Sequence, residues 1–234
     1  MTDYTALERQ LTTTLALDRR PVAIAFRPAP PAGVTPFTGT QPSGCSFWRL
    51  AADGRAFYTV PADHYNCPVG SYTHNIPLPA ERAQELGQTL TLMSDIGYIR
   101  MEEVPGVPQL PTTPVAIVYA PLGDTPVDPD VVMVSGTPAS LMLLHEAALR
   151  AGTAITPLLG RPTCMAVPAA LAGGVASSLG CIGNRVYTDV DGGALYTAIA
   201  GKDLAAIAGQ LETVKSANAT LADFHQGRRA TLTA

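Results

Sequence analysis

The chain has 234 residues, of which 47% are hydrophobic and 15% are charged, and its formal net charge at pH 7 is -4. This composition predicts a compact domain with a large core and excludes a disordered chain, because disordered segments combine low hydrophobicity with high charge. The negative charge also argues against a nucleic-acid partner, since phosphates are bound by basic surfaces.

The chain carries no obvious targeting or membrane signal. Its first twenty residues lack the apolar stretch of a signal peptide, and no apolar run approaches the roughly 20 residues that a membrane span needs. We therefore expect a cytoplasmic protein without a membrane partner. In a reducing compartment, the four cysteines are expected to be free, metal-bound or redox-active rather than permanently bridged.

The N-terminal part of the chain predicts a helix followed by a buried strand. Leu7, Leu11 and Leu15 recur at helical spacing, which indicates a helix over residues 4–17. A short apolar run predicts a strand over residues 21–26, and a loop rich in proline and glycine follows it. The next expected elements are a short helix over 44–52, a strand over 56–60, a loop over 64–73 and a helix over 79–93.

Four prolines between residues 105 and 114 mark the predicted seam between two halves of the chain. The strongest helix signal follows it: Thr137 as cap, Pro138 in the first position and Gly152 as the stop. The other expected elements are strands over 115–120 and 131–134, a short helix over 164–171, a hairpin of strands over 186–190 and 194–199, and a closing helix over 202–224. Strands and helices mix without strict alternation, which favours an α+β fold with α/β as a close second.

A short phrase occurs twice in the chain. Pro21-Val22-Ala23-Ile24 recurs at residues 114–117, and two cysteines follow each copy. The second cysteine of each pair stands in a similar phrase, in which a glycine and then Tyr-Thr follow it. We therefore predict one domain over residues 1–234 built from pseudo-repeated halves, 1–104 and 114–234, with the strands at Val22 and Val115 in equivalent positions.

The cysteines are candidate ligands of one shared centre. Four thiolates around one point are the usual ligand set of an iron–sulfur cluster or a structural zinc. Their spacings lack the short Cys-x-x-Cys type of knuckle, so the prediction depends on where they stand: each lies in a predicted loop or at a helix start, whereas buried structural cysteines usually pack like small hydrophobes. The four residues are Cys45, Cys67, Cys164 and Cys181.

Other interpretations of the cysteines remain open. They include a thiol enzyme with Cys67 or Cys181 as the nucleophile, a dithiol switch that joins the two cysteines of one half, and a purely structural role. Arg185 follows Cys181 by four residues, and we predict that it points toward the cysteines and offsets the charge of a cluster or of a ligand carboxylate. His64 and His74 are candidate ligands or proton carriers, although a lone histidine in a loop is more often a solvated surface residue.

Five motifs together resemble the domain of unknown function 169 family of bacteria and archaea. They are GCSFWRLAADGRAFY, ADHYNCPVG, DVVMVSGTPASLM, GRPTC and SLGCIGNRVYT, and the resemblance spans about residues 5 to 200. It implies that the four cysteines belong to a family pattern, and it supplies no activity. Pro68 directly follows Cys67, and a Cys-Pro pair is a haem-regulatory pattern, so haem is a further candidate cofactor.

The sequence thus predicts a protein that binds a [4Fe–4S] cluster through four thiolates for electron transfer, redox sensing or support of a partner enzyme. A structural zinc module and a thiol enzyme or redox switch are the alternatives. The expected partner is a redox protein or a small molecule, and a homo-oligomer remains open.

Overall fold

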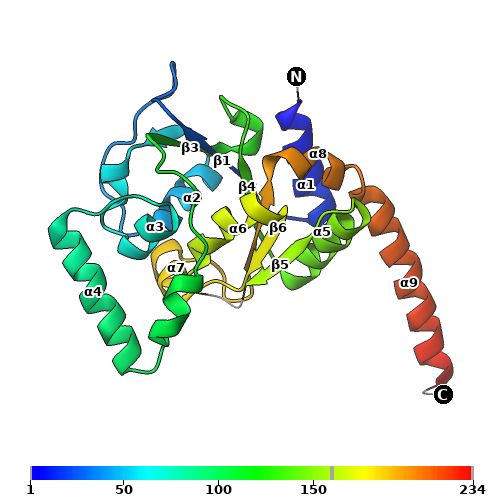
Figure 1. Ribbon diagram of the computed structural model, residues 1–234. Coiled ribbons are helices and arrows are strands. Elements are labelled where there is room, and N and C mark those ends of the chain that lie inside the picture. Colours follow the sequence, from blue (N-terminus) through cyan, green and yellow to red (C-terminus); the bar gives the residue numbers. More distant parts are fainter. Residues whose placement is uncertain (1, 159–160, 233–234) are drawn as a thin grey trace.

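A seven-stranded mixed β-sheet forms the centre of the computed structural model, which describes residues 2–158 and 161–232 (Figure 1). The strand order is β2-β3-β1-β4-β7-β6-β5, and neighbouring strands are antiparallel except β5 and β6. This sheet with its flanking helices confirms the predicted α+β class. The strands are β1 (Val22–Arg27), β2 (Phe57–Thr59), β3 (Ala116–Pro121), β4 (Val131–Gly136), β5 (Ile155–Leu158), β6 (Val175–Ser178) and β7 (Leu195–Ala200).

Helices cover both faces of the sheet, because successive side chains of a strand point to opposite sides and both sides are apolar here. The aromatic core, which contains Phe47 and Tyr119, packs under α2, α3 and α6. The aliphatic core, which contains Leu15 and Ile207, packs under α1, α5 and α8. The helices are α1 (Tyr4–Leu15), α2 (Gly44–Ala52), α3 (Pro68–Thr73), α4 (Ala80–Asp95), α5 (Pro138–Arg150), α6 (Ala166–Gly173), α7 (Ile182–Thr188), α8 (Leu204–Ala208) and α9 (Leu211–Leu232), with the short 3-10 helices η1 (Pro61–His64), η2 (Met101–Gly106), η3 (Leu122–Asp124), η4 (Thr163–Met165) and η5 (Gly201–Asp203).

The sheet is arranged symmetrically about the contact between β1 and β4. Moving outward, β3 lies beside β1 and β7 beside β4, and then β2 and β6 follow, each antiparallel to its inner neighbour. Each side also carries a helical turn with a cysteine, a strand, and a short helix capped by a second cysteine: α2, β2 and α3 on one side, and η4, β6 and α7 on the other. Cys45 therefore corresponds to Cys164, and Cys67 corresponds to Cys181.

The two copies of Pro-Val-Ala-Ile do not occupy equivalent places. They lie in β1 and β3, which are adjacent and antiparallel, with Val22 opposite Pro121. In the symmetric arrangement β1 corresponds to β4, so the predicted equivalence of the strands at Val22 and Val115 is wrong. Both strands are covered on two faces, and such strands favour short apolar runs whatever their place in the sheet. The predicted boundary after residue 104 also separates β3 from β1 and β2, the strands with which it pairs.

Two short helices form where the sequence predicted a strand and a loop. Residues 186–190 were predicted as a strand, but Ile182–Thr188 form α7, because Cys181 caps the helix by accepting a hydrogen bond from the Asn184 amide at 3.5 Å. Residues 64–73 were predicted as a loop, but Pro68 opens α3. Proline is well suited to a first helical position, so this start signal was available in the sequence.

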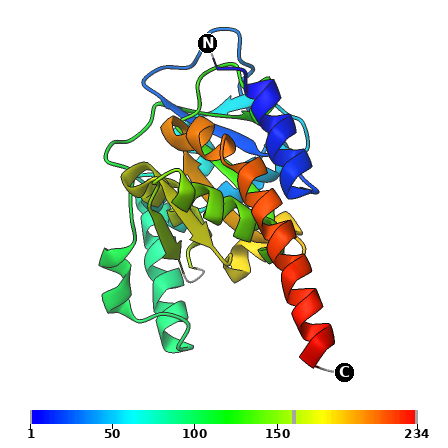
Figure 2. The same cartoon turned by 90° about the vertical axis from the view of Figure 1, so that its right-hand side faces the viewer.

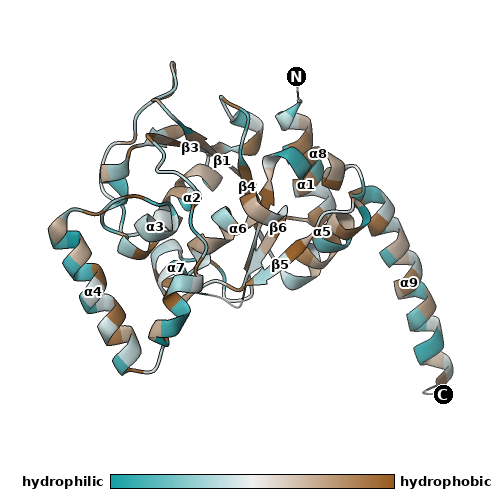
Figure 3. Cartoon of the chain, viewed as in Figure 1, coloured by the Kyte–Doolittle hydropathy of each residue, from teal (hydrophilic) through white to brown (hydrophobic). Residues whose placement is uncertain are grey.

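Two helices have little contact with the cores. None of the residues of α4 is buried, and α9 buries only Leu211 and Val214. Figures 1 and 2 show α9 extending away from the sheet, and Figure 3 shows mixed hydropathy along it. Among the described residues, no helix combines the length and the apolar character that crossing a membrane requires.

Candidate thiol site

The four cysteine-bearing segments pack together on the aromatic-core side of the sheet. The helix α2 contacts α3, η4 and α7, and α3 also contacts η4 (Figure 1). Cys45 lies in the first turn of α2 and Cys164 in η4, whereas Cys67 and Cys181 stand at the caps of α3 and α7. The sequence placed Cys45 and Cys164 correctly at helix starts, whereas the helices that follow Cys67 and Cys181 were not predicted.

The four thiols differ in exposure, and all of them are free. Cys45 is 6% exposed and Cys164 is 5% exposed, so both belong to the aromatic core. Cys67 and Cys181 are half-buried. In the symmetric arrangement the two buried thiols thus occupy equivalent positions, and so do the two half-buried thiols.

Burial favours the protonated form of three of the four thiols. It is the largest cause that raises the pKa of Cys45, of Cys67 and of Cys164 above the ordinary value. The other cysteines add to the effect: negative charge on Cys164, Cys67 or Cys181 raises the pKa of Cys45 further, and charge on Cys181 raises that of Cys67. The region therefore disfavours several thiolates at once.

Cys67 has the surroundings that best suit a reactive thiol. Backbone hydrogen bonds from Gly44 and Gly70 lower the pKa of Cys67 and offset part of the effect of burial. Gly44 is the first residue of α2, so the sulfur receives an amide from the positive end of a second helix. Gly70 is required for this approach, because a β-carbon there would lie 2.8 Å from the Cys67 Sγ atom.

The four cysteines do not form a metal centre. Among residues 2–158 and 161–232, no group of three or more histidine, cysteine or acidic side chains has an arrangement that would hold a metal ion. The prediction of an iron–sulfur protein with four cysteine ligands is therefore wrong. The thiols share one buried region and influence one another electrostatically, but sequence spacing carries no information on whether sulfur atoms converge on a point. The same finding gives no support to a zinc site, and nothing observed tests the haem alternative.

The guanidinium of Arg185 is occupied by backbone carbonyl oxygens. It donates hydrogen bonds to Leu179 at 2.7 Å and to Asp191, Gly192 and Ala194 at 3.2 Å each. These bonds tie the segment after β6 to the turn before β7. They explain the arginine structurally, and its predicted role toward a cofactor remains a prediction.

His64 and His74 are buried in the aromatic core and are not the solvated loop residues that the sequence favoured. Each is 2% exposed. His64 Nε2 lies 2.8 Å from the Thr59 hydroxyl, and His74 Nδ1 donates to the Gly70 carbonyl at 2.9 Å. Burial lowers the pKa of His64 to about 3 and that of His74 to about 4, so both imidazoles are neutral at pH 7.

Several buried polar atoms of the aromatic-core side have no hydrogen-bond partner among the described residues. They include Trp48 Nε1, Tyr119 Oη and His74 Nε2. Burial is the largest cause that raises the pKa of Tyr119, and charge on Cys45, Cys164 and Cys67 adds to it. An unpartnered buried polar group costs about 1–3 kcal/mol, and such a concentration is typical of a functional site. Tyr119 was not predicted from the sequence, because it lies far from every cysteine along the chain.

Comparison with known proteins identifies the family. The model of the DUF169 family, described as uncharacterised ArCR proteins, matches residues 10–210, a range that includes all four cysteines. No curated protein and no solved structure gives a significant match. The resemblance that the five sequence motifs indicated is thereby confirmed, and the chain belongs to the DUF169 family.

Proposed function

We propose that the protein is a thiol–disulfide redox protein in which Cys67 and Cys181 form a reversible disulfide. The proposal is supported by the placement of the two less buried thiols: both are half-buried caps of short helices, α3 and α7, and both of these helices contact α2. Charge on Cys181 also adds to the raised pKa of Cys67, of which burial is the largest cause. Their counterparts Cys45 and Cys164 are buried, so a dissolved oxidant reaches the first pair more readily.

Cys67 is the attacking nucleophile in this proposal, because the Gly44 and Gly70 amides favour its thiolate. The Cys67 thiolate attacks one sulfur of a low-molecular-weight disulfide, whose S–S bond breaks and releases one thiolate. The Cys181 thiolate then attacks the Cys67 sulfur of the mixed disulfide and releases the second thiol. Two protein thiols are oxidised, one external disulfide is reduced to two thiols, and each new thiolate takes up a proton.

Burial raises the pKa of Cys67, which sets the pH dependence of the reaction. The thiolate fraction at neutral pH is small and increases up to about tenfold for each pH unit below the pKa. Disulfide formation is therefore expected to be faster at pH 8.5 than at pH 7. Slow formation of the disulfide suits a protein that responds to sustained exposure to an oxidant. It does not suit a rapid peroxide scavenger.

The test is oxidation of the whole chain with glutathione disulfide, followed by alkylation of the remaining thiols and peptide mass mapping. The expected product is a peptide pair linked through Cys67 and Cys181, with Cys45 and Cys164 alkylated only after unfolding. Cys67→Ser is expected to abolish the link, and Cys181→Ser to leave Cys67 as a mixed disulfide with glutathione. Cys164→Ala is the matched control, because it removes a buried thiol and leaves the proposed pair.

Two results would contradict the proposal. One is a protein that stays fully reduced under conditions in which glutathione disulfide oxidises an exposed dithiol. The other is a link between the two cysteines of one side, Cys45 with Cys67 or Cys164 with Cys181, which would assign the switch to a different pair.

A further inference from the structure

The two sides of the symmetric sheet carry their corresponding elements in the same chain order. On one side this order is β1, α2, β2, α3 and β3, and on the other it is β4, η4, β6, α7 and β7. The connections before the last strands differ. Residues 74–115 join α3 to β3 and contain α4 and η2, whereas residues 189–194 join α7 to β7 and contain no helix. The connection after α7 thus supplies no counterpart of α4.

The long connection covers the outer side of α3. The helix α4 contacts α3 and lies beside it in Figure 1. The Tyr72 hydroxyl of α3 donates to the Val104 carbonyl at 3.4 Å, and the Gln109 side-chain amide donates to the Tyr72 carbonyl at 2.8 Å. Tyr72 is half-buried as a result. The outer side of α3 therefore packs against its own chain.

The corresponding side of α7 is apolar and exposed. In the two similar phrases around the cysteines, Tyr187 takes the place of Tyr72. Ile182 and Val186 stand one turn apart on α7, and Leu179 stands just before the helix. These three side chains and Tyr187, here called the α7 patch, are between 46% and 62% exposed. Exposed apolar side chains that gather in one place mark interaction surfaces, whereas scattered ones need no explanation.

The charges around the α7 patch do not suit an anionic ligand. Arg185 is the only cationic residue between residues 179 and 191, and its guanidinium donates to four backbone carbonyls. Asp189 and Asp191 follow the helix, and Asp189 is paired with Arg49. Glutathione disulfide is an anion at pH 7, so this segment offers it no uncompensated positive charge. The patch instead matches an uncharged, apolar surface.

We propose that the α7 patch docks a segment of a partner protein whose disulfide exchanges with Cys67 and Cys181. The segment takes the place over α7 that α4 and η2 take over α3. This inference rests on the proposed function and names its substrate class, a protein disulfide with apolar neighbours. Cys181 caps α7 and Ile182 directly follows it, so a segment on the patch brings its sulfur atoms close to the thiols.

The exchange has the same balance as with a low-molecular-weight disulfide. The Cys67 thiolate attacks one sulfur of the partner, whose S–S bond breaks, and the Cys181 thiolate then releases the second sulfur. The bond between Cys67 and Cys181 forms, and the protons of the two protein thiols pass through the solvent to the two thiols of the partner. Docking raises the local concentration of the disulfide at the thiols and leaves the chemistry unchanged.

Two uncharged probes test the substrate class on the whole chain. They are the disulfide-linked dimers of the capped tripeptides Leu-Cys-Phe and Ser-Cys-Ser, which differ in the apolar neighbours of the sulfur. The rate of formation of the link between Cys67 and Cys181 is measured with each probe at one pH. The apolar probe is expected to react at least about tenfold faster, since burial of its side chains on the patch favours the complex.

One variant of the patch and one matched control separate docking from general hydrophobicity. Ile182→Gln is expected to reduce the ratio of the two rates to less than about threefold, because it removes an apolar side chain from the patch. Leu149→Gln is the control, since Leu149 is 64% exposed on α5, which packs over the aliphatic core. The control is expected to keep the ratio of the native protein. An equal loss of the ratio in both variants would overturn the proposal.

A measurement without redox chemistry separates this proposal from the redox function. The two tripeptides with S-methylated cysteine cannot exchange, and the apolar one is expected to slow the alkylation of Cys181 by iodoacetamide at least about threefold more than the polar one. Equal protection by both peptides overturns the docking surface, and equal rates with the two disulfide probes overturn the substrate class. Selective protection without any link between Cys67 and Cys181 refutes the exchange and retains the docking surface. A native dimer that Ile182→Gln dissociates would assign the patch to a second copy of the chain and overturn the proposal.

Discussion

Single residues around the thiol site are held in their neutral forms by burial. Cys45, Cys164 and Tyr119 all have raised pKa values, while those of His64 and His74 are lowered, and in each case burial is the largest cause. Charged groups are expensive in such surroundings unless they are paired. The site is therefore suited to thiols that react one at a time, with charge present only during the attack.

The two buried histidines predict a loss of stability in mild acid. Their pKa values of about 3 and about 4 in the folded protein lie below the value of about 6.5 in the unfolded chain. Between these limits the unfolded chain binds more protons, so the free energy of unfolding falls as the pH is lowered. From pH 7 to pH 5 the decrease is expected to be about 2 kcal/mol for each histidine, measured by urea unfolding.

Substitution of one histidine isolates its share of this effect. His64→Gln retains a polar group near Thr59 and is expected to reduce the difference between pH 7 and pH 5 by about 2 kcal/mol. His225→Gln is the control, because His225 is exposed on α9. Equal pH dependence in the native protein and in His64→Gln would show that the imidazole is not buried in its neutral form.

At the scale of elements, the short helices α3 and α7 matter because of what stands at their first positions. Each begins at a cysteine, and in α3 the sulfur lies against the helix itself because Gly70 has no side chain. The helix α3 also joins the thiol site to the buried histidines, since the Gly70 carbonyl accepts a hydrogen bond from His74. A substitution of Gly70 is therefore expected to change the surroundings of both Cys67 and His74.

Gly70→Ala is expected to impair the thiol without unfolding the protein. The added β-carbon would lie 2.8 Å from the Cys67 Sγ atom, so the sulfur must rotate away from the Gly44 and Gly70 amides. The rate of disulfide formation with glutathione disulfide should fall at least about tenfold, since the amides no longer favour the thiolate. The measurement is the rate of thiol loss at a fixed pH.

Gly87→Ala supplies the matched control within the helix α4. A β-carbon at Gly87 meets no atom within 4 Å, and the helix has no buried residue. This variant should be more stable by about 0.5–1 kcal/mol, as alanine usually is in a helix interior, with an unchanged rate of oxidation. If both glycine variants oxidise at the rate of the native protein, the contact between Gly70 and Cys67 has no part in the reaction.

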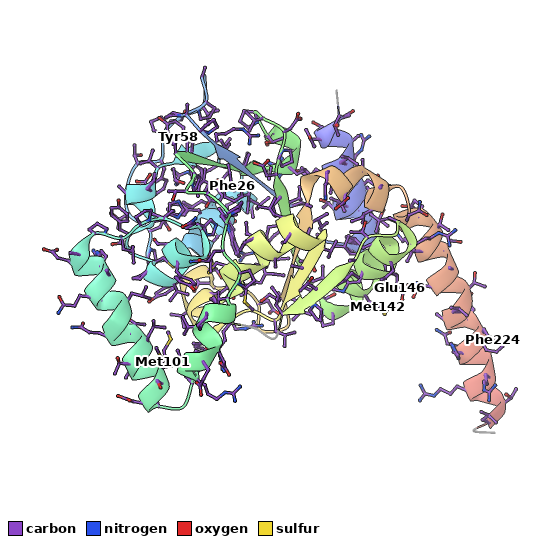
Figure 4. All side chains as sticks on the ribbon, viewed as in Figure 1. Phe26, Tyr58, Met101, Met142, Glu146 and Phe224 are labelled. Atoms are coloured by element: carbon purple, nitrogen blue, oxygen red, sulfur yellow. The ribbon has the colours of Figure 1, made fainter. Side chains whose placement is uncertain are left out.

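At the scale of the whole molecule, the sheet and its two cores are complete without most of α9. Its buried residues, Leu211 and Val214, lie in the first turn, and Asn218 contacts Glu146 of α5 at 2.5 Å. Figure 4 shows Phe224 on the part of α9 that lies away from Glu146 and Met142, and Phe224 is 59% exposed. The last turns thus add little buried area.

Removal of residues 219–234 is therefore expected to change the melting temperature of the protein by less than about 2 °C. A shorter chain that ends at Gln210 lacks Leu211 and Val214 and should lose several kcal/mol, as when buried aliphatic side chains are deleted from a core. Thermal unfolding of both chains at several concentrations is the measurement. Marked destabilisation of the longer chain, or a loss of oligomers with it, would assign α9 a structural role that its burial does not indicate.

The sequence by itself determined the elements whose signals are local. Thr137, Pro138 and Gly152 specified α5 almost to the residue, and apolar runs specified β1, β3, β4 and β7, because capping and periodicity act within a few residues. The motifs also identified the family. The similar phrases around Cys67 and Cys181 have similar structures, since each of these cysteines caps a short helix.

Only the tertiary structure decided how these elements meet. The short strands β5 and β6 were not predicted, since each becomes a strand through its neighbours in the sheet and not through its own pattern. The same holds for the site: contacts across the fold set which thiols are buried, that no metal-ligand group forms among the described residues, and that charge on three cysteines raises the pKa of Tyr119. Burial, desolvation and the convergence of side chains depend on residues far apart in the chain, and a single sequence records no distance between them.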